Sequence, residues 1–147
     1  MIISVDIISD TMIDTISLII LLTVLAHIIE DFHLQGKMAD MKQKSWWVEQ
    51  WAKHNSVAPK LPPKYRYDYI IVLILHGMEW SICVSLPALI LGDVSLPLAM
   101  IVAIVVIMGL THALIDDLKA NRLAINLWTD QLLHMAQLIL LLSVLLW

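Results

Sequence analysis

Long apolar stretches alternate with short polar segments along this chain, and four of the apolar stretches are about twenty residues long. They run from about 15 to 34, 69 to 91, 96 to 118 and 127 to 147. A helix needs about twenty consecutive apolar residues to cross the hydrocarbon core of a bilayer. The pattern therefore predicts an all-α protein, in which four transmembrane helices form one integral membrane domain over residues 1–147.

The composition supports this prediction. Hydrophobic residues make up 60% of the chain and charged residues 15%, whereas a soluble domain has about 45–50% and about 25%. The single Cys83 excludes an intramolecular disulfide and a cysteine-rich zinc module. The segment before the first stretch has no Lys or Arg, so we expect no cleavable signal peptide. Nothing in the sequence predicts nucleic-acid binding, and membrane lipid is the expected partner.

The basic residues predict an orientation, because all nine lie in two loops. Seven of them fall in the loop of about residues 35–68, and Lys119 and Arg122 fall between the third and fourth stretches. With four spans, these loops lie on one side of the membrane, and the other side has no basic residue. The positive-inside rule then makes both loops cytoplasmic and places both termini outside.

The first loop contains a second amphipathic pattern, from about residue 37 to 53. At helical spacing Met41, Val48 and Ala52 share one side, and Lys42 and Glu49 lie on another. This pattern predicts a cytoplasmic interfacial helix between spans one and two, lying on the inner leaflet. Two roles stay open for it, a simple amphipathic anchor and a lid over a site.

Histidine and aspartate recur four residues apart inside the apolar stretches. The pairs are His27 and Asp31, His112 and Asp116, and Asp130 and His134, with His76 alone in the second stretch. One ionisable residue costs about 2.5–3.5 kcal/mol at the centre of a membrane helix. Residues four apart share a helix face, and all seven lie in the expected cytoplasmic half. We therefore expect them to meet in one membrane-embedded metal or acid–base site.

The expected ligands for a divalent metal are all seven of these residues. Imidazole favours zinc, with manganese or iron as alternatives, over magnesium. Asp116 and Asp130 are the candidate catalytic residues, each as a ligand or as a general base. Two other interpretations stay open: some aspartates orient a histidine through its second ring nitrogen, or the pairs hold the bundle together without a metal.

Several polar neighbours have roles that the pattern alone leaves open. Gln35 and Gln131 are expected to bind substrate or to cap the site, and Glu79 to face the same cavity. Glu30 is expected at the membrane interface. Lys119 is either an anion contact or a lysine whose ammonium group extends to the membrane surface.

The ordered set of polar residues resembles a known family. The matching motifs are His27-x3-Asp31-Phe32-x-Leu34-Gln35, a lone His76, His112-x2-Ile115-Asp116-x2-Lys119 and Asp130-Gln131-x2-His134. Over nearly the whole chain they resemble domain of unknown function family 3307, small polytopic membrane proteins of bacteria and their phages. The resemblance implies the architecture, the site and a bacterial inner-membrane location. The longer tryptophan-rich first loop departs from the family pattern.

Three functions are compatible with these features. The first is a metal-dependent hydrolase acting on a lipid-linked or membrane-associated substrate, and small inner-membrane proteins proposed to be such hydrolases are loosely similar. The second is a non-catalytic scaffold that binds a partner and contains a structural metal or a His–Asp network. The third is a transporter of divalent cations or protons, although the outer halves of the spans contain no histidine or carboxylate. A pore between subunits of a homo-oligomer would remove that objection.

Overall fold

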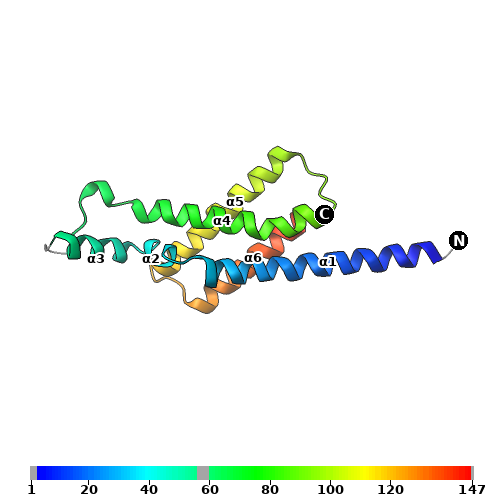
Figure 1. The fold of residues 1–147 in the computed structure, drawn as a ribbon, viewed down its shortest axis with the longest axis horizontal. Coiled ribbons are helices and arrows are strands. Elements are labelled where there is room, and N and C mark those ends of the chain that lie inside the picture. Colours follow the sequence, from blue (N-terminus) through cyan, green and yellow to red (C-terminus); the bar gives the residue numbers. More distant parts are fainter. Residues whose placement is uncertain (1–2, 56–59, 147) are drawn as a thin grey trace.

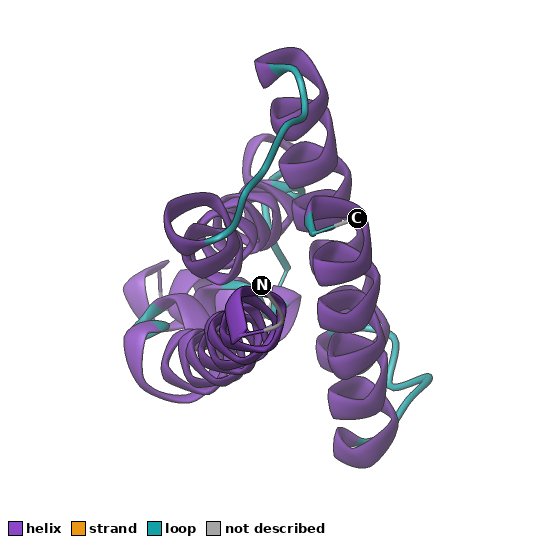
Figure 2. Cartoon of the chain, turned by 90° about the vertical axis from the view of Figure 1, so that its right-hand side faces the viewer, coloured by secondary structure: helices purple, strands orange, loops and turns teal. Residues whose placement is uncertain are grey.

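The computed structural model describes residues 3–55 and 60–146, with side chains from residue 11 onward. Figure 2, seen from the N-terminal end, shows only helices and loops over these residues. In chain order the elements are α1 (Ile3–Ile29), the π turn η1 (Glu30–Leu34), α2 (Met38–Met41), α3 (Lys44–Asn55), the 3-10 turn η2 (Pro63–Tyr65), α4 (Asp68–Leu91), α5 (Leu98–Ala120) and α6 (Leu127–Leu145).

Four segments are long and apolar enough to cross a membrane. They are Thr11–Leu34, Pro63–Leu91, Leu98–Ala120 and Leu127–Leu145. Large apolar side chains cover their outer surfaces, as a lipid environment requires. The predicted all-α fold with four spans is confirmed, with ends that differ from the expected ones by a few residues.

The helices form an elongated bundle. Figure 1 shows α1 and α4 side by side along the long axis, with α5 running obliquely across α4. Helix α6 packs against α5, α4 and α1. The buried stripe of α1 and its π turn is Ile19, Thr23, His27 and Glu30, at the spacing of one helix face.

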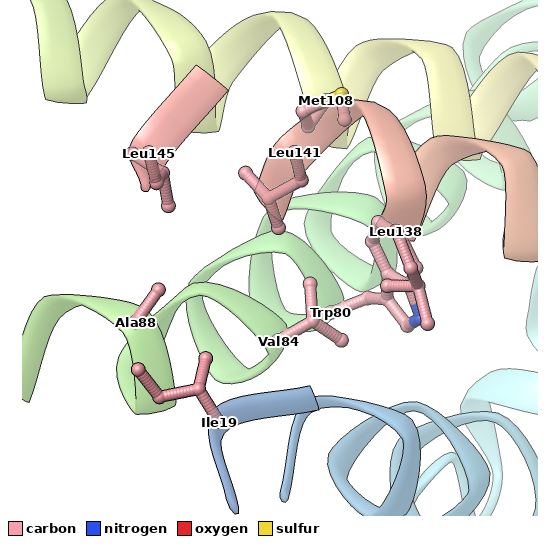
Figure 3. Packing of buried hydrophobic residues seen from close by; sticks show 8 residues of the cluster. All are labelled: Ile19, Trp80, Val84, Ala88, Met108, Leu138, Leu141 and Leu145. Atoms are coloured by element: carbon pink, nitrogen blue, oxygen red, sulfur yellow. The ribbon is translucent and has the colours of Figure 1, made fainter. Parts of the chain in front are cut away.

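The hydrophobic core occupies the half of the bundle that lies away from the two basic loops. All four long helices contribute to it, through Ile19, Trp80, Val84, Ala88, Met108, Leu138, Leu141 and Leu145 (Figure 3). In each helix these residues lie on the far side of the histidine from the basic loop, and Trp80 lies one turn beyond His76. The core therefore closes one side of the polar cluster described below.

Helices α4 and α5 are in close backbone contact where two glycines face each other. A Cβ atom at Gly77 would collide with the carbonyl oxygen of Gly109, and one at Gly109 would lie 2.9 Å from the carbonyl oxygen of Gly77. Small residues permit such close backbone contact between membrane helices. Gly77 follows His76 directly, so this contact also sets how near His76 comes to His112.

The predicted helix between spans one and two is present, but it is divided into α2 and α3. Asn121, in the second basic loop, explains the break. Its side-chain oxygen accepts the N–H of Lys44 at 2.7 Å, and its amide donates to the carbonyl of Lys42 at 3.0 Å. These backbone groups are therefore not available to one continuous helix. The same contacts place both basic loops at one end of the bundle.

Candidate metal centre

The seven ionisable residues predicted from the sequence converge at the loop end of the bundle. Helix α1 and its π turn contribute His27 and Asp31, α4 contributes His76, and the remaining four, His112, Asp116, Asp130 and His134, come from α5 and α6. The side chain of Asp31 is 5% exposed, and the other six residues are at most 2% exposed. The expected convergence of these residues in one buried cluster is confirmed.

Asp31, His76 and His112 form a first group of candidate ligands. The two Nε2 atoms lie 3.3 Å apart, and each is 3.6 Å from Oδ1 of Asp31. A point equidistant from these three atoms lies about 2 Å from each, which is the length of Zn–N and Zn–O bonds. The three atoms are therefore close enough together that they could hold one metal ion.

The second group of candidate ligands is His112, Asp116 and His134. Nε2 of His134 lies 3.5 Å from Oδ1 of Asp116, and Nε2 of His112 lies 3.9 Å from Oδ2 of Asp116. His112 belongs to both groups, so they form one continuous set of three imidazoles and two carboxylates. This buried His/Asp cluster could hold a metal ion.

The hydrogen bonds of His134 leave its Nε2 facing two carboxylates without a hydrogen-bond partner. Gln137 donates from Nε2 to Thr111 at 2.7 Å, so its Oε1 accepts the N–H of His134 Nδ1 at 3.1 Å. The Nε2 of neutral His134 then presents a lone pair to Oδ1 of Asp116 and Oδ1 of Asp130, both at 3.5 Å, without a hydrogen bond. A buried lone pair facing two carboxylates is unfavourable unless a metal ion or a proton lies between them.

His27 reaches the cluster in a different role. The indole N–H of Trp80 donates to His27 Nδ1 at 2.9 Å, so neutral His27 donates from Nε2 to Gln131 Oε1 at 3.2 Å. The amide of Gln131 in turn donates to Asp31 and to Asp130, at 3.3 and 3.1 Å. Both ring nitrogens of His27 are thus engaged, and His27 lies outside the two ligand groups.

Asp130 also lies outside the two ligand groups. Its Oδ2 accepts from Lys119 Nζ at 2.6 Å and from Gln131 Nε2 at 3.1 Å. Its Oδ1 is buried and accepts no hydrogen bond. This oxygen is an available proton acceptor beside His134.

Sequence reasoning missed two residues that complete the cluster. Lys42, expected on the polar side of an interfacial helix, is buried and donates to Oδ2 of Asp116 at 2.6 Å. Trp80 stacks on His112 with ring centroids 4.1 Å apart and an interplanar angle of 21°. The position of Trp80, four residues after His76, could have revealed it, whereas nothing in the local pattern distinguishes Lys42 from the other basic residues of its loop.

Two expectations for nearby carboxylates are wrong. Glu30 is buried and not interfacial, because it lies three residues after His27 on the inward stripe that runs from α1 into η1. Glu79 is exposed because the inward face of α4 follows His76, Trp80 and Val84 instead.

The two glutamines do cap the site: Gln35 donates to both the carbonyl and the carboxylate of Asp31.

The local backbone also departs from a regular helix at Asp31. The π turn η1 begins at Glu30 and contains Asp31, and such turns often occur at functional sites. Its carboxylate lies within 4.0 Å of nitrogens of all four buried histidines. Asp31 is therefore the carboxylate common to the whole cluster.

Comparison with family models, curated proteins and solved structures finds no match to this chain.

Proposed function

We propose that this protein is a membrane-embedded, metal-dependent hydrolase, with zinc as the first candidate metal and manganese or iron as alternatives. The observation that carries the proposal is the five-residue ligand set of Asp31, His76, His112, Asp116 and His134. A structural zinc is satisfied by four protein ligands, and catalytic sites add an open position for water or substrate. We also propose, on the resemblance of its motifs, that the chain belongs to domain of unknown function family 3307.

The residues around the ligand set have separate roles in this proposal. A bound divalent metal supplies Lewis-acid chemistry, activating water and polarising a phosphoryl or acyl oxygen. Oδ1 of Asp130 accepts a proton from the attacking water, while Lys119 and Gln131 hold its other oxygen. The water oxygen bonds to phosphorus or carbon, the leaving atom departs with the bonding electron pair, and it takes the proton from Asp130. His27 positions Asp31 and Asp130 through Gln131.

The position of the cluster favours a lipid-linked or membrane-associated substrate. The hydrophobic core closes one side of the cluster, and the side chains from the two basic loops lie on the other. A substrate therefore approaches from the loop end, where a headgroup at the membrane surface is within reach. The same closure counts against a transport path through one subunit.

Replacing Asp130 with asparagine tests the catalytic part of this proposal. The asparagine side chain keeps the size of the aspartate but cannot accept the proton, so hydrolysis should fall about 10²- to 10⁴-fold, with metal content unchanged. The measurement is turnover of phosphatidic acid, ester and amide lipid substrates by metal-loaded protein in detergent. Glu79→Gln, at an exposed carboxylate on α4, is the matched control. Equal turnover by wild type and Asp130→Asn would show that Asp130 takes no part in the reaction.

A non-catalytic scaffold with a structural metal is the second candidate, and the burial of the ligand set favours it. All five side chains are at most 5% exposed, and Lys42 covers Asp116. A chelator should then lower the unfolding temperature of the protein, and no lipid substrate should be turned over. If a lipid substrate is turned over, and if turnover stops on removal of the metal and returns when metal is added back, the protein is a hydrolase.

We further propose that both basic loops face the cytoplasm of a bacterial cell, because all nine basic residues lie in them. Single cysteines at Asn55 and Asp93, in a Cys83→Ala background, should report this orientation. A membrane-impermeant maleimide should label Asp93→Cys in intact spheroplasts, and Asn55→Cys only after lysis. The reverse labelling order would show that the loops face the outside and contradict this orientation.

A further inference from the structure

We propose that Lys42 and Lys119 form an anion-binding pair on the loop side of the metal centre, and that the substrate group bound there is a phosphate ester. This inference rests on the proposed metal-dependent function and names its substrate class. It follows from the position of the two ammonium groups, from the charge of the cluster and from the way in which Lys42 is held.

The two lysines make equivalent contacts with the centre. Lys42 Nζ lies 2.6 Å from Oδ2 of Asp116, and Lys119 Nζ lies 2.6 Å from Oδ2 of Asp130. The other oxygens of these two carboxylates both lie 3.5 Å from Nε2 of His134. A single carboxylate therefore lies between each ammonium group and Nε2 of His134.

The charge of the cluster changes sign when a metal binds. Asp31, Asp116 and Asp130 bring three negative charges and the two lysines bring two positive charges, so one negative charge remains while the histidines are neutral. Histidine ligands must be neutral to bind a metal, so a divalent ion leaves one positive charge. An uncompensated charge is costly in a buried site, and an anionic group removes that cost, whereas a neutral ester or amide does not.

Hydrogen bonds to Asn121 hold the backbone at Lys42 in place. Its backbone carbonyl accepts from Asn121, and the N–H of Lys44 donates to the same side chain. A buried lysine is expensive, and a carboxylate that binds a metal already has a cationic partner. We infer that the metal takes over Asp116 and frees the ammonium group of Lys42 for the substrate.

An anion can reach this pair from the loop end of the bundle. The side chain of Lys119 is 35% exposed, whereas that of Lys42 is 11% exposed. An incoming anion therefore meets Lys119 first, and Lys42, from the first basic loop, completes the site. A lipid phosphomonoester and a soluble phosphate present the same chemistry, so both sources have to be tested.

The experiment measures phosphate binding and metal content on the same samples of full-length protein. Metal-loaded wild type is titrated with inorganic phosphate in detergent, and in a second arm with nanodiscs containing phosphatidic acid or only phosphatidylcholine. Lys42→Gln and Lys119→Gln should each weaken phosphate binding at least about tenfold, as expected for the loss of a charge-assisted hydrogen bond. Their metal content should equal that of wild type. Lys53→Gln, at an exposed lysine of α3, should bind phosphate normally.

The outcomes separate this inference from the proposed function. Metal-loaded wild type that binds neither phosphate nor phosphatidic acid would overturn the anion site and leave the metal centre intact. Loss of metal from both lysine variants would also overturn it, since the lysines would then serve the ligand set. Wild type that binds no metal would instead contradict the proposed function. Tighter binding in phosphatidic acid nanodiscs than to free phosphate would identify the lipid as the source.

Discussion

Replacing His112 with alanine is expected to abolish metal binding. His112 belongs to both ligand groups, so its loss leaves neither group with its three residues. Losing even a residue that only orients a ligand reduces metal affinity about 10- to 100-fold, and loss of a shared ligand should cost at least about 100-fold. Wild type purified without chelator should contain about one zinc, manganese or iron per chain, and His112→Ala should contain none. Elemental analysis of detergent-purified protein measures this directly.

Three further variants make this result specific. His33 is exposed, and His33→Ala should keep the full metal content. His27→Asn is the more informative comparison, because both nitrogens of His27 are engaged by Trp80 and Gln131. It should also retain metal if His27 is a hydrogen-bonding residue, and lose it if His27 is the ligand that the sequence pattern predicts. Alanine at position 112 removes a ring stacked on Trp80, so His112→Gln, which fills more of the space, should be measured as well.

Metal-free wild type, or His112→Ala that retains as much metal as wild type, would contradict the metal centre. The His–Asp network would then be a purely structural or proton-carrying one. In that case a proton, and not a metal ion, occupies the space between His134 and its two carboxylates. Neutron or infrared measurements on the carboxylates would show that proton.

The spans and the convergence of the site were predictable because both depend on short-range geometry. Twenty apolar residues imply a span whatever its neighbours, and a separation of four residues places His112 and Asp116 on one face of any α-helix. The basic residues then fix which ends of the helices lie together. None of these steps requires knowledge of how the helices pack.

The roles of individual residues depended on packing that the pattern does not contain. His27 and His134 have the same spacing to an aspartate, yet Trp80 takes the Nδ1 of one and Gln137 that of the other. Lys42 enters the site because Asn121, 79 residues further along the chain, holds its carbonyl. Glu30 is buried although it looked interfacial. Contacts between distant segments decided each of these cases, and a single sequence does not show them.

Replacing Gly77 with alanine is expected to separate α4 from α5 and to disturb the centre between them. The added Cβ collides with the backbone oxygen of Gly109 and lies 3.2 Å from the Cβ of Ala113. Backbone atoms cannot move aside as a side chain can, so the helices themselves must shift. Overpacking of this kind costs about 1–3 kcal/mol, and the gain of about 1 kcal/mol from alanine's helix propensity offsets only part of it.

The same substitution at the facing glycine should be much milder. A Cβ at Gly109 meets the flexible end of Met78 at 3.0 Å as well as the Gly77 oxygen at 2.9 Å. Its smaller clash is comparable with the propensity gain, so Gly109→Ala should change the free energy of unfolding by less than about 1 kcal/mol. Unfolding by denaturing detergent in mixed micelles measures both variants. Leu75→Ala, at a side chain on α4 that is 57% exposed, controls for truncation on the lipid face.

A second readout links this packing to the centre. His76 precedes Gly77 and its Nε2 lies 3.3 Å from Nε2 of His112, so a shift between the helices widens the triangle that matches an ion. Gly77→Ala should therefore lose metal affinity along with stability, whereas Gly109→Ala and Leu75→Ala should keep it. If Gly77→Ala unfolds and binds metal like wild type, α4 and α5 are not held at this distance in the membrane. The close glycine contact would then have no part in setting the geometry of the site.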